Sequence, residues 1–137
     1  GRLRHYAPHV CARYWKVSTT GRNMDFDKLT DEEILNIANP LMDNLMEGSS
    51  ERNHQKHTRD FTDRLKAIVT EENLLKQWRE NKIGEFSKRE FLSIIHKCDS
   101  IFVLWKQWFT NSHEEFLAEI CIVEQAGKFL VDHVWIR

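Results

Sequence analysis

The chain has 137 residues, of which 41% are hydrophobic and 30% charged, and its formal net charge is −1. This composition is ordinary for a globular domain with a single core, and it excludes a disordered or low-complexity protein. No apolar run approaches the roughly 20 residues that a membrane-spanning helix needs, so we expect no membrane partner.

Residues 1–23 differ from the rest of the chain in charge. They contain five bases and no acid, whereas residues 24–137 hold the other 15 bases and all 21 acids, a net charge of −6. Gly1 is typical of the residue left after tag removal, and Met24 is a plausible translation start. We therefore interpret 1–23 as a basic leader of upstream origin and 24–137 as one α+β domain. The alternative is a nucleic-acid-binding arm, but the acidic body argues against a nucleic-acid partner.

The cysteines and short motifs give little support to catalysis. Cys11, Cys98 and Cys121 form an odd, sparse set without metal or redox spacing, which is typical of reduced thiols in a cytoplasmic protein. The sequence has no GxGxxG, P-loop, GxSxG or HExxH pattern. We therefore expect no nucleotide, metal or other cofactor.

The first half of the domain predicts helices. Thr30 begins a capping box, and apolar residues then repeat at helical spacing as far as Gly48, with a kink or a break expected at Pro40. A second and more polar helix is expected over residues 51–68. Thr70 caps a short third helix.

A histidine pair lies on the second predicted helix. His54 and His57 share one face of it. One helical face supplies at most two well-placed ligands and the sequence offers no obvious third, so a metal site is not expected. The same histidines could instead line the mouth of a pocket.

The last third of the chain predicts an antiparallel sheet. Runs rich in Ile, Val, Phe and Trp cover residues 91–136, and turns are expected at Cys98–Asp99, Asn111–Ser112 and Ala126–Gly127. A helix over residues 89–96 is the alternative for the first run. We predict an α+β fold in which N-terminal helices pack on a curved, four-stranded antiparallel meander.

The turns also predict the strand register. Directly opposed residues share a face of the sheet. The predicted pairs are His96 with Ile101, Ile94 with Val103, Leu92 with Trp105, Trp105 with Ile120, Ile120 with His133, and Ile122 with Val131. This register places Trp105, Gln107 and His133 on the core face.

The layout resembles the cone-shaped fold of the nuclear transport factor 2-like superfamily, also described as cystatin-like, which includes SnoaL-like cyclases and ketosteroid isomerases. The resemblance spans residues 27–137 and includes the ending VEQAGKFLVDHVWI, a glycine turn followed by an apolar strand with polar residues. The compact chain with its leader is also similar to hypothetical proteins encoded by integron cassettes. The resemblance implies an apolar pocket between helices and sheet, used for proton transfer by an Asp or His or for binding alone.

The core face is the place where such a pocket is expected. Small-ligand pockets are apolar with a few placed polar groups, and the candidate ligand-binding residues are Trp105, Gln107, His133 and Phe61, with Leu41 and Leu45 closing the cavity. His133 is the candidate catalytic residue, because burial keeps an imidazole neutral and able to act as a base. A structural histidine is the alternative. The predicted core face lacks an Asp, which counts against an isomerase or cyclase.

The opposite face of the sheet is too apolar for a solvated surface, which predicts an interface. Its candidate residues are Leu104, Trp108, Cys121, Val123 and Val134. We expect a homodimer packed sheet to sheet, although the basic leader could cover the same surface. The expected function is a non-catalytic dimeric module that binds a small apolar ligand or a protein. The alternative is a SnoaL-like isomerase, cyclase or hydratase that uses a pocket histidine.

Overall fold

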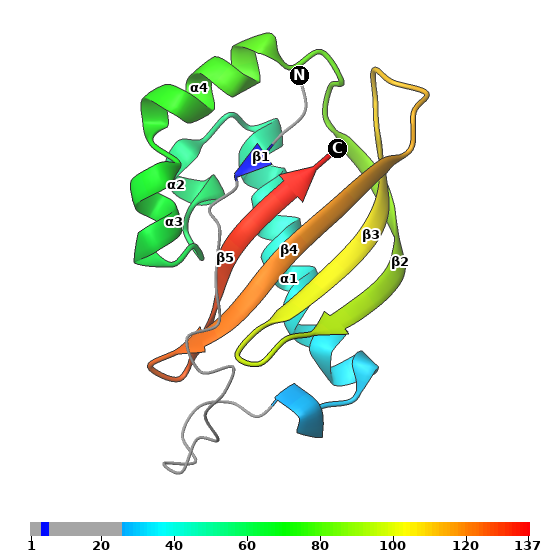
Figure 1. Cartoon of the computed structure of the whole chain (residues 1–137). Helices are drawn as coiled ribbons and strands as arrows, with labels where there is room; N and C mark the ends of the chain where they lie inside the picture. The colour runs from blue at the N-terminus through cyan, green and yellow to red at the C-terminus, as the bar shows by residue number, and fades with distance from the viewer. Residues whose placement is uncertain (1–3, 6–25) are drawn as a thin grey trace.

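The computed structural model describes Arg4, His5 and residues 26–137 (Figure 1). Its elements are β1 (Arg4–His5), η1 (Phe26–Lys28), α1 (Asp31–Ser50), α2 (His54–His57), α3 (Asp63–Ile68), α4 (Glu71–Glu80), β2 (Phe86–His96), β3 (Ile101–Phe109), β4 (Phe116–Gln125) and β5 (Lys128–Ile136). The prediction of N-terminal helices packed on a four-stranded antiparallel meander is confirmed for β2 to β5. The short β1 adds an unpredicted fifth strand, in the order β1-β5-β4-β3-β2.

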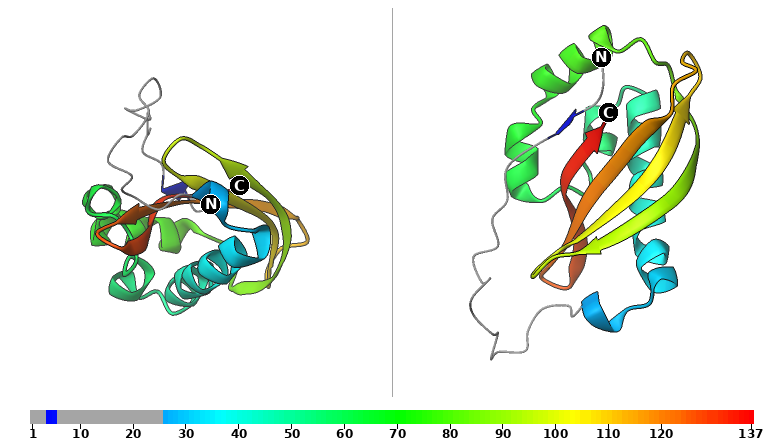
Figure 2. Two further views of the ribbon diagram at one scale, coloured as in Figure 1. Left: turned by 90° about the horizontal axis from the view of Figure 1, so that it is seen from below. Right: turned by 45° about the vertical axis from the view of Figure 1, so that its right-hand side comes forward.

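Helix α1 packs on the concave face of the sheet, which curves around it (Figure 2). Thr30 and Glu33 form the predicted capping box, and Ile34, Ala38 and Met42 are buried at helical spacing. The helix runs through Pro40 without the division that the sequence suggests. In the part of the chain that the structure describes, no helix is long and apolar enough to cross a membrane.

The predicted second helix is wrong as a single element. It is divided into α2 and α3 because the segment between them pairs with the edge of β5. Phe61 lies beside Val131, the Thr62 N–H donates to the Val131 carbonyl at 2.9 Å, and the Val131 N–H donates to the Asp60 carbonyl at 2.7 Å. Thr62 then caps α3 through its side chain. Thr70 caps α4 as predicted.

The register between β2 and β3 is confirmed near the hairpin and altered further along. His96 lies opposite Ile101 and Ile94 opposite Val103, as predicted. A bulge then makes Leu92 an extra residue, so Phe91 rather than Leu92 lies opposite Trp105. The prediction for Leu92 is wrong because turn chemistry fixes the register only as far as the first bulge.

The register between β3 and β4 differs from the prediction by two residues. Trp105 lies opposite Ala118 rather than Ile120. A shift of two residues keeps every side chain on its face, because the side-chain period of a strand is two. Trp105 is therefore on the core face as predicted, with 1% of its surface exposed.

The register between β4 and β5 changes the predicted faces. Ile122 lies opposite Val131 as predicted, but a bulge follows, and beyond it Cys121 lies opposite His133 and Ile120 opposite Val134. His133 is therefore on the outer face and Val134 on the core face, so both assignments from the sequence are wrong. The extra residue of the bulge is Asp132.

Asp132 explains why the bulge forms where it does. Its carboxylate accepts a hydrogen bond from the Thr62 hydroxyl at 2.7 Å and pairs with the Arg64 guanidinium at 2.7 Å. Arg64 also donates to the Asp132 carbonyl at 2.6 Å. A buried carboxylate needs such partners, and they lie toward α3 rather than on the outer face. The bulge turns Asp132 toward them and shifts the following residues by one.

Gly48 marks a close approach between α1 and α2 and gives a test of this packing. A Cβ built on Gly48 would lie 2.6 Å from the backbone N and Cα of His57. We expect Gly48→Ala to destabilise the fold by about 2 kcal/mol, because overpacking outweighs the roughly 1 kcal/mol gain in helix propensity. Urea unfolding monitored by circular dichroism would measure this, and a variant as stable as the wild type would contradict the close packing.

Candidate functional site

The predicted pocket on the core face is filled by side chains. Trp105, Phe61 and Leu45 are at most 2% exposed, and Gln107 is fully buried. The Gln107 amide donates to the Met46 sulfur at 3.5 Å, while its Oε1 has no partner within the described residues. The structure thus gathers Trp105, Gln107 and Phe61 around a packed interior and places His133 on the other side of the sheet.

The histidines of α2 are structural. His57 is fully buried, its Nδ1–H donates to the Leu45 carbonyl at 2.9 Å, and its ring meets the rings of Phe61 and Trp78 edge-on, each at 5.6 Å. The Nε2 of His54 is 3.0 Å from the Val69 carbonyl. His57 is therefore enclosed, whereas the half-buried His54 borders an open hollow of about 950 Å³ that also involves Lys66 of α3 and Glu71 of α4. No metal-binding group of three or more His, Cys, Asp or Glu side chains occurs in the described part of the chain.

His133 belongs to a charged cluster on the outer face of the sheet. Its Nε2–H donates to the Glu119 carboxylate at 3.0 Å, and the other oxygen of Glu119 lies 3.5 Å from the Arg137 guanidinium. The His133 ring lies 5.8 Å from the Phe102 ring, and the Arg137 guanidinium lies 3.7 Å from the centre of the Trp135 ring. The cluster joins β4 to β5 and the end of the chain.

Cys121, His133 and Glu119 have the residue types of a cysteine-nucleophile triad. Cys121 lies directly across from His133 on the neighbouring strand, and Glu119 orients the imidazole. A nucleophilic cysteine requires a lowered pKa. Burial instead raises the pKa of Cys121 to about 12, with Asp132 and Asp99 adding to the rise. The thiol is therefore protonated and enclosed, and the arrangement does not form a working nucleophile.

The cysteines also correct one expectation from the sequence. Cys121 is a free thiol, as predicted, whereas Cys98 forms a disulfide, so the prediction of a reduced thiol is wrong for Cys98. Cys11 and the basic leader, apart from Arg4 and His5, lie outside the described residues.

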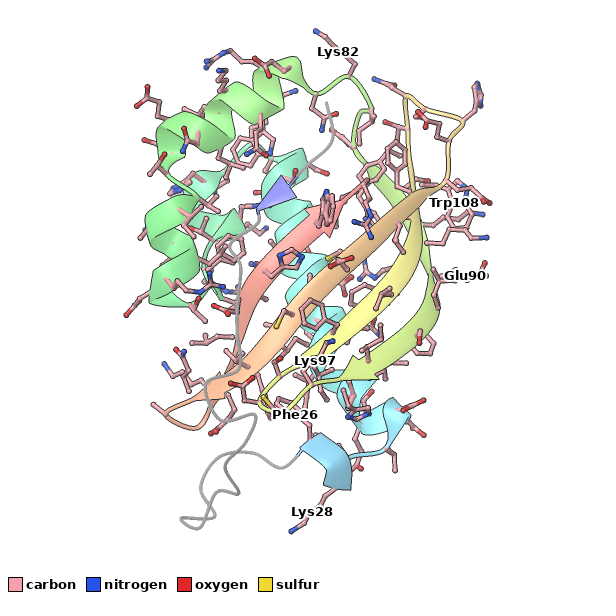
Figure 3. All side chains as sticks on the ribbon, viewed as in Figure 1. Phe26, Lys28, Lys82, Glu90, Lys97 and Trp108 are labelled. Atoms are coloured by element: carbon pink, nitrogen blue, oxygen red, sulfur yellow. The ribbon has the colours of Figure 1, made fainter. Side chains whose placement is uncertain are left out.

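The predicted interface residues are divided between the two faces. Leu104 and Trp108 are half-buried on the outer face, with Cys121 and Val123 buried on the same face, while Val134 faces the core. Trp108 is flanked by two lysines, with the Lys88 and Lys106 ammonium groups 4.6 and 5.9 Å from its ring centre. Figure 3 shows Trp108 and Glu90 on the side of the molecule formed by β2 and β3.

The most exposed apolar side chains gather on β2. Five large hydrophobic side chains are exposed in the described part of the chain, and three of them lie on this strand: Phe91 at 38%, Leu92 at 46% and Ile95 at 43%. The other two, Ile68 and Leu75, lie on separate helices. Sequence reasoning placed Phe91 and Ile95 on the apolar outer face but assigned Leu92 to the core, and it did not distinguish an edge strand from a central one.

Comparison with known proteins assigns the chain to no family: no protein-family model, curated protein or solved structure matches it.

The buried imidazole of His57 predicts a pH-dependent stability. Burial lowers its pKa from 6.5 to about 4. Between these values the unfolded chain binds a proton that the folded chain does not, so the free energy of unfolding falls as the pH drops through this window. The loss reaches about 3 kcal/mol below pH 4. Urea unfolding at pH 7 and pH 4.5 would measure it. His57→Gln, which cannot titrate, should lose less stability between these pH values. Equal losses in the two proteins would show that His57 is not the source of the pH dependence.

The raised pKa of Cys121 predicts an unreactive thiol. At pH 8 a thiol with a pKa near 12 is ionised in roughly one molecule in ten thousand, and only the thiolate attacks alkylating agents. We expect iodoacetamide to leave Cys121 unmodified in the folded protein and to label it rapidly in denaturant, as followed by peptide mass spectrometry. Rapid labelling in the folded protein would revive the triad interpretation.

Proposed function

We propose that this protein is a non-catalytic binding module that associates with a second copy of itself through β2. The observation that carries this proposal is the row of exposed Phe91, Leu92 and Ile95 along the open edge of the sheet. Phe91 lies on the core side of this edge, opposite Trp105, and Ile95 on the outer side, opposite Phe102. Monomeric proteins rarely leave such a surface in contact with water, and an uncovered edge strand is a template for pairing.

The two edges of the sheet are covered to different degrees. At the β5 edge, β1 pairs with Val134 and Trp135, and Phe61 lies beside Val131. At the other edge, β2 runs for 11 residues, paired with β3 on one side and, in the part of the chain that the structure describes, with no strand on the other. The fold therefore closes one edge and leaves available the one that carries the apolar side chains.

A second copy suits this edge because an antiparallel edge is self-complementary. A two-fold rotation lays β2 against its own copy, so that outward N–H groups meet carbonyls along its regular stretches, which the bulges at Ser87 and Leu92 separate. Glu90 and Lys97 are exposed on either side of the apolar residues (Figure 3). An antiparallel copy brings Glu90 of one protomer toward Lys97 of the other, which favours this pairing over a parallel one.

The outer face of β3 continues the side of β2 on which Ile95 lies. Phe102 and Leu104 lie opposite Ile95 and Ser93 of β2, and both are half-buried on the outer face. Trp108, held between Lys88 and Lys106, borders this area and supplies the aromatic anchor that interfaces favour. A dimer formed through β2 would therefore include Leu104 and Trp108, the centre of the interface expected from the sequence.

The nuclear transport factor 2-like superfamily, whose layout the chain resembles, includes members that bind a ligand or a protein without catalysis. The proposed function is of this kind. We infer that the chain is a divergent member of that superfamily, in which the interior between helices and sheet has been filled. A small apolar ligand in that interior has less support, since Trp105 and Phe61 occupy the space where it would lie. A SnoaL-like reaction through His133 has less support still, because that side chain lies on the outer face.

The dimer is tested by charge substitution on β2. We expect light scattering at micromolar concentration to give about twice the monomer mass of 16.4 kDa. Ile95→Glu should raise the dissociation constant at least tenfold, or about 1.4 kcal/mol, because it places a carboxylate in an apolar contact. Trp108→Glu should act in the same direction.

Leu75→Glu is the matched control, since Leu75 is exposed to a similar extent, 38%, but lies on α4. A wild type that is monomeric, or a dimer that Ile95→Glu and Leu75→Glu weaken equally, would contradict the proposal. A variant without residues 1–23 should remain dimeric, and because it also loses β1 from the β5 edge, Ile95→Glu should still weaken its dimer at least tenfold. If only that variant dimerised, the leader and not a second copy would be the normal cover of the surface.

A further inference from the structure

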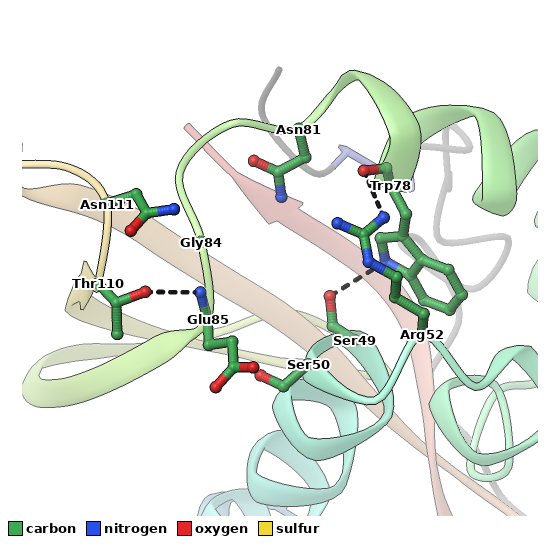
Figure 4. A pocket seen from close by; sticks show the side chains of 9 residues that line it. All are labelled: Ser49, Ser50, Arg52, Trp78, Asn81, Gly84, Glu85, Thr110 and Asn111. Carbon is green, nitrogen blue, oxygen red and sulfur yellow. Dashed lines mark hydrogen bonds between the residues drawn. The ribbon is translucent and has the colours of Figure 1, made fainter.

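A polar cavity of about 310 Å³ opens where the ends of α1 and α4 meet the start of β2 and the loop between β3 and β4 (Figure 4). Its lining consists of Ser49, Ser50, Arg52, Trp78, Asn81, Gly84, Glu85, Thr110 and Asn111. The volume is near the lower limit of small-molecule sites, roughly 300 Å³. The cavity lies apart from the exposed side chains of β2 that carry the proposed dimer.

The helical wall of the cavity is fixed by hydrogen bonds. Arg52 follows the end of α1 with φ +54°, and it forms the turn in which its N–H donates to Ser49 and that of Asn53 donates to Gly48. Glycine is the usual residue at this position. In this chain the position is occupied by Arg52, whose guanidinium donates to the Trp78 carbonyl at 2.7 Å. The Trp78 indole N–H donates in turn to the Ser49 hydroxyl at 3.1 Å.

The opposite wall is equally constrained. The Glu85 N–H donates to the Thr110 hydroxyl at 3.0 Å, and the Ile83 N–H donates to the Asn81 side chain at 2.9 Å. Gly84 has φ +85°, and a Cβ there would lie 2.4 Å from the Thr110 oxygen. The walls are thus held in place before any ligand arrives, which is typical of a binding site.

Two opposite charges border this cavity. The guanidinium of Arg52 uses one donor for Trp78, and no other bond to it occurs among the described residues. The carboxylate of Glu85 lies on the other side, next to Ser50, with the Asn81 amide between the two walls (Figure 4). The carboxyl ends of α1 and α4 add negative partial charge, which disfavours a simple anion. A ligand that carries both charges matches the site.

An apolar recess adjoins the polar cavity and shares Ser49, Ser50, Asn81 and Gly84 with it. Its remaining lining is apolar: Met46, Ile83, Phe86, Phe109 and Ile136. Its volume of about 10 Å³ leaves room for a group the size of one water molecule, so it accepts a methyl group and little more.

We propose that this cavity binds a small zwitterion, a free amino acid with a short side chain. Arg52 holds the carboxylate through its remaining N–H donors, and Glu85 accepts hydrogen bonds from the ammonium group. The amide of Asn81 and the hydroxyl of Ser50 complete the polar contacts, and the methyl group points into the recess.

The test is an NMR titration of the ¹⁵N-labelled full chain with L-alanine, L-alaninamide and propionate. L-Alanine should shift the amide signals of Arg52, Gly84 and Asn111. The two other probes each lack one charge, since the amide has no carboxylate and propionate has no ammonium group, and both should bind at least tenfold more weakly.

Arg52→Gly removes the guanidinium while keeping a residue suited to the positive φ, so the fold should persist and L-alanine binding should fall at least tenfold. Glu85→Gln should weaken L-alanine binding and leave the affinity for propionate no lower. Arg79→Ala, a change of an exposed arginine on α4 outside the cavity lining, should bind as the wild type does. No shift at millimolar L-alanine, equal affinity for propionate, or unchanged binding by Arg52→Gly would each overturn the proposal.

Discussion

The buried carboxylate of Asp132 is the constraint on which the arrangement of the sheet and helices depends. An ionised group inside a protein is tolerated only with close polar partners, and Thr62 and Arg64 provide them from the start of α3. Satisfying that carboxylate places a bulge in β5, and the bulge exchanges the faces of every residue that follows. His133 is turned outward to Glu119, and Val134 and Ile136 turn inward to the core. The same contact holds the short helices beside β5.

This constraint also decides where the protein can interact. Because the segment around Phe61 and the short β1 lie along β5, that edge of the sheet is closed to other strands. The interior is closed as well, since α1 and the curved sheet pack Trp105 and Met42 so that each is almost fully buried. The opposite edge of the sheet, where β2 presents apolar side chains, remains accessible to a partner. The polar cavity at the C-terminal ends of α1 and α4 is also accessible. Both proposals concern surfaces that the central packing leaves open.

Polar groups on the outer face are organised for structure rather than for catalysis. Glu119 lies between His133 and Arg137, and each of these contacts joins neighbouring strands or the end of the chain. The adjacent thiol of Cys121 is enclosed, and its raised pKa keeps it protonated. Glu119, His133 and Cys121 have the residue types of a catalytic triad, but burial raises the pKa of the thiol and the charged groups connect neighbouring strands.

The sequence by itself determined those structural features that depend only on residues close together in the chain. Hydrogen bonds and φ preferences within a few residues specify helix caps and tight turns. We could therefore predict the caps at Thr30 and Thr70, the turns at Cys98–Asp99 and Ala126–Gly127, and with them the meander of four strands. The tertiary structure alone decided the bulges and therefore the faces. Asp132 meets Thr62 across 70 residues, and no local pattern indicates that this pair will form or that it will insert a residue into β5. The predicted pocket failed at His133 for that reason, whereas Trp105 and Gln107 kept their predicted face because their error in register was two residues and not one.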